Sequence, residues 1–186
     1  MKTPFVFAAL AAGATLIAGP AAIAQSETSA AAPLLRTSTS FDLVVHAPYA
    51  EAAALFGPNG ERAWAGKHWN PQFIHPLPAA DTEGAVFTIS HGGLNAVWVN
   101  TLFDKAARHF QYVYFLPGIM VTVIDVRFEP IDKASTAVNV VYTRTAIAEE
   151  GNEHVAKMTE SDRTAGKEWQ HAIEAYLASR KANPAP

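Results

Sequence analysis

The chain has 186 residues, with 14 Lys or Arg against 17 Asp or Glu, so its formal net charge at neutral pH is −3. Because the chain is weakly acidic and has no basic stripe to neutralise phosphates, we do not expect nucleic acid as a partner. Cysteine is absent, which excludes disulfide, thiolate and iron–sulfur chemistry. The length suits one globular domain with a substantial core.

The first residues have the pattern of a cleavable export signal. Lys2 supplies a positive charge, residues 5–18 form a short apolar run, and a glycine-proline pair ends that run. Small residues at Ala22 and Ala24 then match the site that signal peptidase cleaves. A membrane anchor is the alternative, but it would need about 20 apolar residues, and no run in the chain is that long. We therefore expect residues 1–24 to be a signal peptide and the mature protein to be periplasmic or secreted, without a stable membrane anchor.

The rest of the chain divides into one domain and two tails. Residues 25–33 are rich in Ser, Thr and Ala, and residues 181–186 end in Asn-Pro-Ala-Pro; both tails are expected to be disordered. The domain of residues 34–180 begins with an alternating, β-branched segment over residues 36–45, which predicts a strand. A short helix is predicted over residues 49–56, because a proline opens it and a Gly-Pro pair closes it.

A second helical turn over residues 61–65 and an ordered loop over residues 67–80 are expected next. Five further strands follow, separated by short turns of Gly, Pro, Asp and Lys. Such short connections make neighbouring strands antiparallel, because parallel neighbours need a crossover of about a dozen residues. Apolar and charged residues alternate between residues 120 and 129, so the sheet should have a dry face and a wet face. The five strands are predicted over residues 85–91, 95–103, 109–116, 120–129 and 136–146.

The last predicted element is a helix over residues 152–180. Its apolar residues recur every three or four positions and form one stripe along the helix. Because the dry face of the sheet is the available partner for this stripe, we predict an α+β fold. In this fold a curved antiparallel sheet of about six or seven strands wraps around the C-terminal helix. The stripe consists of Val155, Met158, Ala165, Trp169, Ala172, Ile173, Tyr176 and Leu177.

The order of these elements resembles the START-related helix-grip superfamily (SRPBCC; polyketide cyclase and lipid transport). The resemblance runs from about residue 36 to residue 178, and its motifs are structural rather than catalytic. It implies the helix-grip fold, with two short helices after the first strand and a space between sheet and helix that is filled by side chains or occupied by a ligand. The matching segments are Val45-His46-Ala47-Pro48, Gly66-Lys67-His68-Trp69-Asn70-Pro71, Gly84-Ala85-Val86-Phe87, Val140-Val141-Tyr142-Thr143 and the closing Trp169, Ile173, Tyr176 and Leu177.

Ten residues are expected to line that space and are the candidate ligand-binding residues. Most are aromatic, and aromatic side chains either line a cavity or fill a core, since each carries a large apolar area. The candidates are Trp69, Phe87, Trp98, Asn100, Tyr114, Tyr142, Met158, Asp162, Ala165 and Trp169.

Asp162 is the most suggestive of these candidates, because it interrupts the apolar stripe of the helix. A carboxylate there is costly unless it is paired or hydrogen-bonded. Asp162 either orients a hydroxyl or amine of a ligand, or pairs with Arg144 or Arg163, or lies in water where the helix overhangs the sheet. Tyr142 and Asn100 offer polar contacts to a ligand, or they make ordinary structural hydrogen bonds.

Two functions follow from this prediction. The first is a carrier for a hydrophobic small molecule, lipid-like or aromatic. The second is a cyclase- or hydrolase-type enzyme in which Asp162, Tyr142 or His91 performs acid–base chemistry. Because catalysis needs an acid and a base near one carbonyl, and the sequence displays no such pair, the carrier is favoured. No spacing of histidines indicates a metal site and no glycine-rich loop indicates a phosphate site, so no metal or cofactor is expected.

Processing can be tested directly. Cleavage after Ala24 predicts a mature chain that begins at Gln25, because the small residues that signal peptidase recognises end there. Intact-mass measurement of the protein recovered from the exported fraction checks this. Recovery of a chain that still carries residues 1–24 in that fraction would contradict it.

Overall fold

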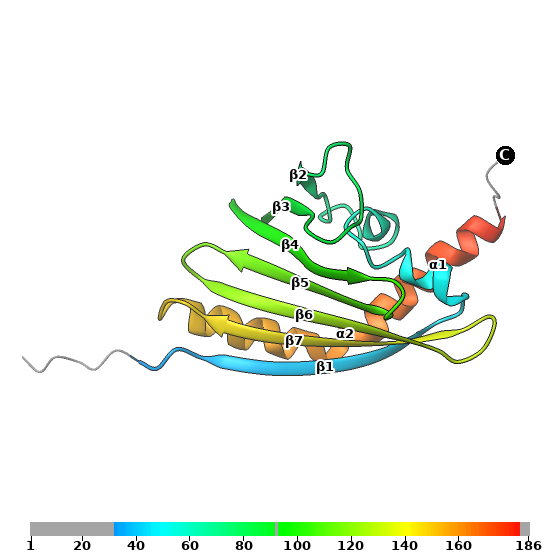
Figure 1. Cartoon of the computed structure of the whole chain (residues 1–186). Coiled ribbons are helices and arrows are strands. Elements are labelled where there is room, and N and C mark those ends of the chain that lie inside the picture. Colours follow the sequence, from blue (N-terminus) through cyan, green and yellow to red (C-terminus); the bar gives the residue numbers. More distant parts are fainter. Residues whose placement is uncertain (1–31, 92, 183–186) are drawn as a thin grey trace, which may run out of the picture. The chain divides into compact units, whose positions relative to one another are not determined.

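A seven-stranded antiparallel sheet and a long helix dominate this computed structural model, which describes residues 32–91 and 93–182 (Figure 1). The predicted signal peptide and most of the two predicted tails lie outside the described residues. Within the described ranges, no helix is long and apolar enough to cross a membrane.

The helices and strands follow one another in the predicted order. The strands lie side by side as β1-β7-β6-β5-β4-β3-β2, so the first strand pairs with the last and every pair is antiparallel. This arrangement confirms the predicted helix-grip fold. The elements are β1 (Arg36–Val45), α1 (Tyr49–Ala53), the 3-10 helix η1 (Gly60–Ala63), β2 (Gln72–His75), β3 (Val86–His91), β4 (Leu94–Asp104), β5 (His109–Leu116), β6 (Met120–Pro130), β7 (Thr136–Ala146) and α2 (Gly151–Ala182).

The structure differs from the sequence prediction mainly in the segment predicted as a loop. Residues Gln72–His75 form β2, which pairs with β3 at the edge of the sheet and places Phe73 opposite Phe87. Prolines bound this strand on both sides. Because proline cannot donate to a strand ladder, such a segment is confined to a short edge strand, and four residues are too few to show a periodic pattern.

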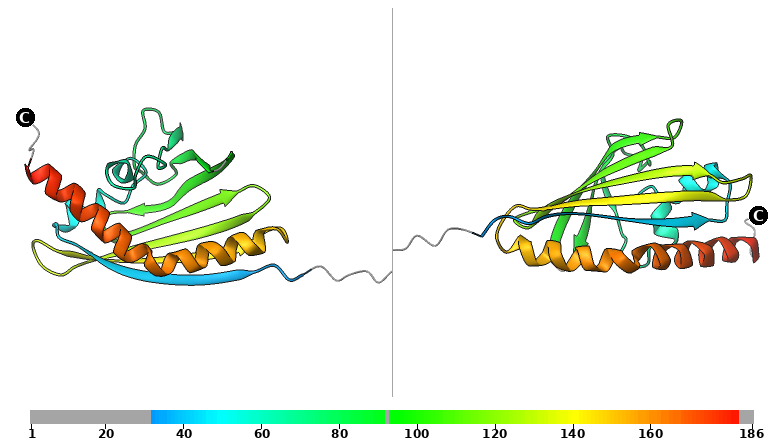
Figure 2. Two further views of the ribbon diagram at one scale, coloured as in Figure 1. Left: turned by 180° about the vertical axis from the view of Figure 1, so that it is seen from behind. Right: turned by 90° about the horizontal axis from the view of Figure 1, so that it is seen from below.

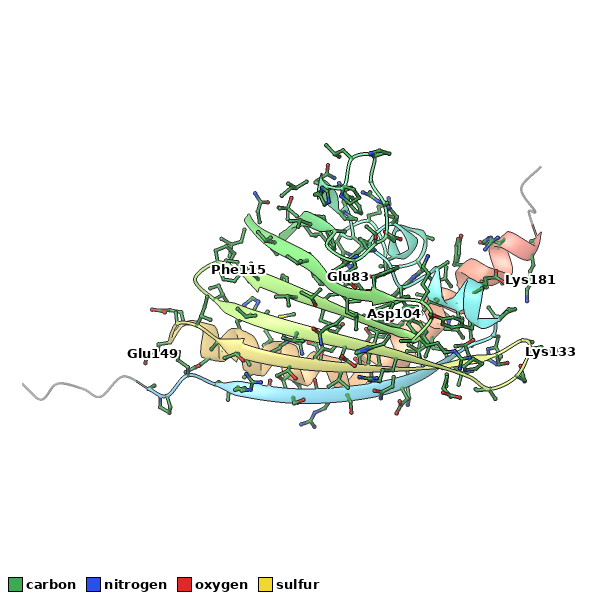
Figure 3. The ribbon with its side chains drawn as sticks, viewed as in Figure 1. Glu83, Asp104, Phe115, Lys133, Glu149 and Lys181 are labelled. Atoms are coloured by element: carbon green, nitrogen blue, oxygen red, sulfur yellow. The ribbon has the colours of Figure 1, made fainter. Side chains whose placement is uncertain are left out.

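The two faces of the sheet differ as predicted. Along β6, Ile124 and Phe128 are buried whereas Arg127 is exposed. The buried face is the one turned toward α2. Figure 3 shows Phe115 near the β5–β6 turn and Lys133 in the β6–β7 turn, at opposite ends of the sheet. The side chains on the face turned away from α2 contact solvent, and those on the face turned toward α2 form the core.

Helix α2 lies along β1 and β7 rather than over the middle of the sheet (Figure 2). Its buried residues are accordingly rotated from the predicted stripe, and Met158, Ala165 and Trp169 are only half-buried. Gly166 explains the close approach to β1, because a Cβ atom at this position would lie 3.0 Å from the carbonyl oxygen of Asp42. The buried residues of α2 are Gly151, Val155, Asp162, Gly166, Ile173 and Leu177.

Replacement of Gly166 should loosen this contact. Gly166→Val is expected to lower the free energy of unfolding by about 1–3 kcal/mol, the usual cost of overpacking, although valine is the better helix former. Chemical denaturation monitored by circular dichroism measures this. Lys167→Val is the matched control, since Lys167 is exposed on the next position of the helix. Equal stability of Gly166→Val and the wild type would contradict the close approach.

Candidate functional site

An open cavity of about 620 Å³ lies between the dry face of the sheet and the first half of α2. The inner faces of strands β4 to β7 form one wall, and α2 forms the other with Met158 and Ser161. Trp69, from the segment before β2, borders the cavity as well. This volume is typical of a site for a small molecule. We refer to this space as the outer cavity.

A smaller space of about 50 Å³ adjoins the outer cavity deeper in the domain. We call it the inner chamber. Four residues, Trp69, Trp98, Ile124 and Tyr142, line both spaces. About 10–15 Å³ of such volume holds one water, so the chamber has room for a few waters or for one end of a ligand. The other residues that line it are Phe56, Pro58, Glu61, Phe87, Tyr112, Val126 and Trp169.

Aromatic rings fix the shape of both spaces by packing on one another. Trp98 is at the centre of this packing: its ring centroid lies 4.7 Å from that of Tyr114, 5.3 Å from that of Trp69 and 5.9 Å from that of Phe87. Trp169 on α2 packs in the same way against Trp64, at 5.2 Å. Rings in mutual contact have few rotamers open to them, so the walls of the cavity are preorganised.

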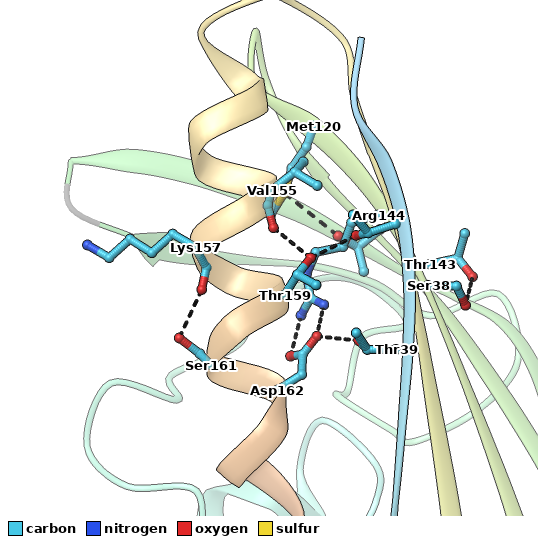
Figure 4. Close-up of polar contacts among 12 residues, drawn as sticks. Ser38, Thr39, Met120, Thr143, Arg144, Val155, Lys157, Thr159, Ser161 and Asp162 are labelled. Atoms are coloured by element: carbon cyan, nitrogen blue, oxygen red, sulfur yellow. Dashed lines mark hydrogen bonds and ion pairs between the residues drawn. The ribbon is translucent and has the colours of Figure 1, made fainter.

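A buried ion pair joins α2 to the sheet beside the cavity (Figure 4). The guanidinium of Arg144, on β7, donates to both carboxylate oxygens of Asp162, and the side chains are only 3% and 8% exposed. Thr39 of β1 donates a third hydrogen bond to Asp162, at 2.6 Å. The Arg144 guanidinium also lies 4.2 Å above the ring of Tyr142. The carboxylate is thus satisfied by the protein itself.

Seven of the ten predicted site residues line the outer cavity or the inner chamber. Three do not. Asp162 pairs with Arg144, which is one of the alternatives predicted from the sequence. Asn100 is buried and donates to the carbonyl of Thr82, and Ala165 packs half-buried against the core. The seven are Trp69, Phe87, Trp98, Tyr114, Tyr142, Met158 and Trp169.

Glu61 lines the inner chamber and is not among the ten residues predicted from the sequence. It lies on η1, is half-buried, and also borders an open hollow on the other side that His68 and Glu168 line. Burial raises the pKa of this carboxyl well above its usual range, and the nearby charge of Asp81 raises it further. One feature of the sequence pointed to Glu61: it precedes Trp64 by three residues, and this spacing places both side chains on the same side of a helical turn.

Tyr112 and Tyr142 line the inner chamber together with Glu61. Burial raises the pKa of both hydroxyls, and the Glu61 charge raises each further. Tyr112 donates its proton to the carbonyl of Phe56. Across the described ranges, no hydrogen bond reaches the hydroxyl of Tyr142. Both hydroxyls therefore stay protonated at neutral pH, and Tyr142 is free to donate.

Basic residues lie toward the open side of the outer cavity. His154 and Lys157 on α2 are exposed there, as is His68 before β2. In the part of the chain that the structure describes, no three His, Cys, Asp or Glu side chains gather as metal ligands would. The side chain of His91 lies outside the described part, so its predicted acid–base role stays a prediction.

The sequence itself matches no family model, and no curated protein matches it either. Solved structures do match in fold. Norcoclaurine synthase from Thalictrum flavum, in complex with dopamine and hydroxybenzaldehyde, is similar with a TM-score of 0.55 and 13% sequence identity, over 94% of this chain and 99% of that one.

Two further structures extend this likeness. The di-domain ARO/CYC protein BexL has a TM-score of 0.58 and 18% identity, over 80% of this chain and 48% of its own. Ara h 8.0201 has a TM-score of 0.54 and 14% identity, over 77% of this chain and 99% of its own. At these identities the likeness shows the fold alone. It confirms the predicted helix-grip fold.

The buried ion pair generates a prediction about stability. Asp162→Leu leaves the guanidinium of Arg144 buried without its partner, so the free energy of unfolding should fall by about 3–5 kcal/mol. The double variant Arg144→Met/Asp162→Leu removes both charges and should recover to within about 1 kcal/mol of the wild type. Urea denaturation measures all three proteins. A double variant as unstable as the single one would contradict this account.

Proposed function

We propose that the protein binds an apolar small molecule, lipid-like or aromatic, between the sheet and α2, and that it carries or sequesters this molecule. Given the predicted signal peptide, we also propose that it does so after export. The observation that carries the proposal is the outer cavity of about 620 Å³. Its walls are mainly aromatic and aliphatic, so a ligand there would be held chiefly by burial of apolar surface.

Two further features support binding over a filled core. Aromatic rings on the cavity wall pack on one another, and the cavity beside them has a size that suits a small molecule. In addition, the fold neighbour norcoclaurine synthase was solved with two small aromatic molecules, dopamine and hydroxybenzaldehyde. Aromatic ligands are therefore one class that this fold accommodates.

An enzyme of the cyclase or hydrolase type is the alternative, and Glu61 is the observation that favours it. Acid–base catalysis needs an acid and a base within reach of one substrate atom. Among the described residues that line the inner chamber, Glu61 is the only carboxyl-bearing or basic side chain. A single carboxyl suffices to orient a ligand, so the carrier remains the function that we propose.

Binding can be measured with N-phenyl-naphthylamine, a neutral fluorophore that brightens in apolar surroundings. We expect saturable binding of one probe per protein. Ile124→Phe should weaken it about tenfold or more, equivalent to about 1.4 kcal/mol, because Ile124 lines both spaces and the larger ring fills the junction. Fluorescence titration gives both affinities.

The matched control is Val123→Phe, the same change at the neighbouring position of β6 that faces away from the core. It should bind the probe like the wild type, and circular dichroism should show both variants folded. Absence of saturable binding to the wild type, or full binding by a folded Ile124→Phe variant, would overturn the proposed function.

A further inference from the structure

The polar groups that border the inner chamber are distinctive because nearly all of them are donors. Tyr142 has a hydroxyl without a hydrogen-bond partner in the described part of the chain. Trp98 is 9% exposed, and its Nε1–H is buried with no acceptor among the described residues. A buried donor without an acceptor costs free energy that a suitable ligand would recover.

Glu61 is the third polar group at the inner chamber without a hydrogen-bond partner for its side chain among the described residues. It borders the inner chamber beside Tyr142, and no hydrogen bond or ion pair from the described residues reaches its carboxyl. The nearby Asp81, by contrast, accepts hydrogen bonds from the backbone N–H groups of Asn59 and Gly60, at 2.9 and 3.2 Å. Asp81 thus has two backbone donors at the start of η1, whereas the Glu61 carboxyl has no hydrogen-bond or ion-pair partner among the described residues.

This environment favours the neutral acid at Glu61. The inner chamber has no lysine, arginine or histidine among its described lining residues, and in the open hollow on the other side Glu61 lies with one histidine, His68, and a second carboxylate-bearing residue, Glu168. No ion pair joins Glu61 to any of these groups, so ionisation would place an unpaired charge beside aromatic rings. The Asp81 charge acts in the same direction, and together these effects raise the pKa of the Glu61 carboxyl well above its usual range. A protonated carboxyl is a hydrogen-bond donor.

We propose that protonated Glu61 donates a hydrogen bond to a carbonyl oxygen of a neutral, largely apolar ligand whose carbonyl end enters the inner chamber, with the Tyr142 hydroxyl as a second donor. This inference rests on the proposed function and adds to it the chemical class of the ligand. The body of the ligand lies in the outer cavity, where apolar walls supply affinity. The carbonyl end fits the chamber, whose 50 Å³ admits a single small group.

Three probes of one skeleton separate the possible ligand classes. Methyl naphthyl ketone offers a carbonyl, ethylnaphthalene offers no polar atom, and naphthylethylamine offers a cation. Displacement of N-phenyl-naphthylamine, followed by fluorescence, gives the affinity of each. At mildly acidic pH, we expect the ketone to bind roughly three- to tenfold more tightly than the hydrocarbon, the gain of one net hydrogen bond.

The pH dependence identifies the donor. Because Glu61 donates only when protonated, the advantage of the ketone should be largest at low pH and should fall to the part supplied by Tyr142 as the pH rises through the raised pKa of Glu61. Glu61→Gln keeps a donor that does not titrate, so its preference for the ketone should persist at all pH values. Glu61→Leu keeps only the Tyr142 donor, so its preference for the ketone should be smaller than that of the wild type at low pH and should not change with pH.

Two controls locate the effect. Glu153→Gln makes the same substitution on the exposed face of α2 and should behave as the wild type does, with the same decrease of ketone preference as the pH rises. Tyr142→Phe keeps the ring but removes the second donor, so it should reduce the advantage of the ketone without changing its pH dependence.

The outcomes distinguish this inference from the proposed function. Equal binding of ketone and hydrocarbon by the wild type would overturn the inference and leave the proposed function intact. Preference for the amine over both, increasing with pH, would overturn it as well and would assign Glu61 the role of a carboxylate that binds cations. If none of the three probes binds, both proposals fall.

Discussion

The buried contact between Arg144 and Asp162 decides where the long helix lies on the sheet. A guanidinium and a carboxylate that are both shielded from water must meet, because either charge alone in the interior would cost several kcal/mol. The two-pronged geometry of the contact fixes the rotation of α2 as well as its distance from β7. Thr39 adds β1 to the same contact, so one carboxylate joins the helix to the first and last strands.

This placement of α2 is what leaves a cavity in the domain. Gly166 brings the helix close to β1, and the helix therefore lies toward the β1–β7 side of the sheet. The inner faces of β4 and β5 receive less cover from it, and large rings such as Trp98 and Tyr114 occupy part of the remaining space. Because flat rings cannot fill a curved gap completely, an outer cavity and an inner chamber remain.

The sequence predicted the cavity better than it predicted the polar groups in it. Apolar candidates such as Trp98 and Met158 line the cavity, because periodicity alone assigns them to the dry faces that must meet. The polar candidate Asp162 has partners within the protein instead. Glu61 could not be foreseen in the same way, since η1 is too short for a pattern and its position at the chamber depends on how the segment after α1 folds back over the sheet.

What the sequence determined by itself is the architecture: the number and order of the long strands, their antiparallel pairing and the presence of a long closing helix. These follow from the alternation of side chains along strands, from short turns and from helical periodicity, all of which are local. The tertiary structure alone decided the edge strand β2, the rotation of α2 and the neighbours of Glu61. Each of these depends on contacts between segments far apart in the chain, such as Arg144 with Asp162, whose geometry no local pattern contains.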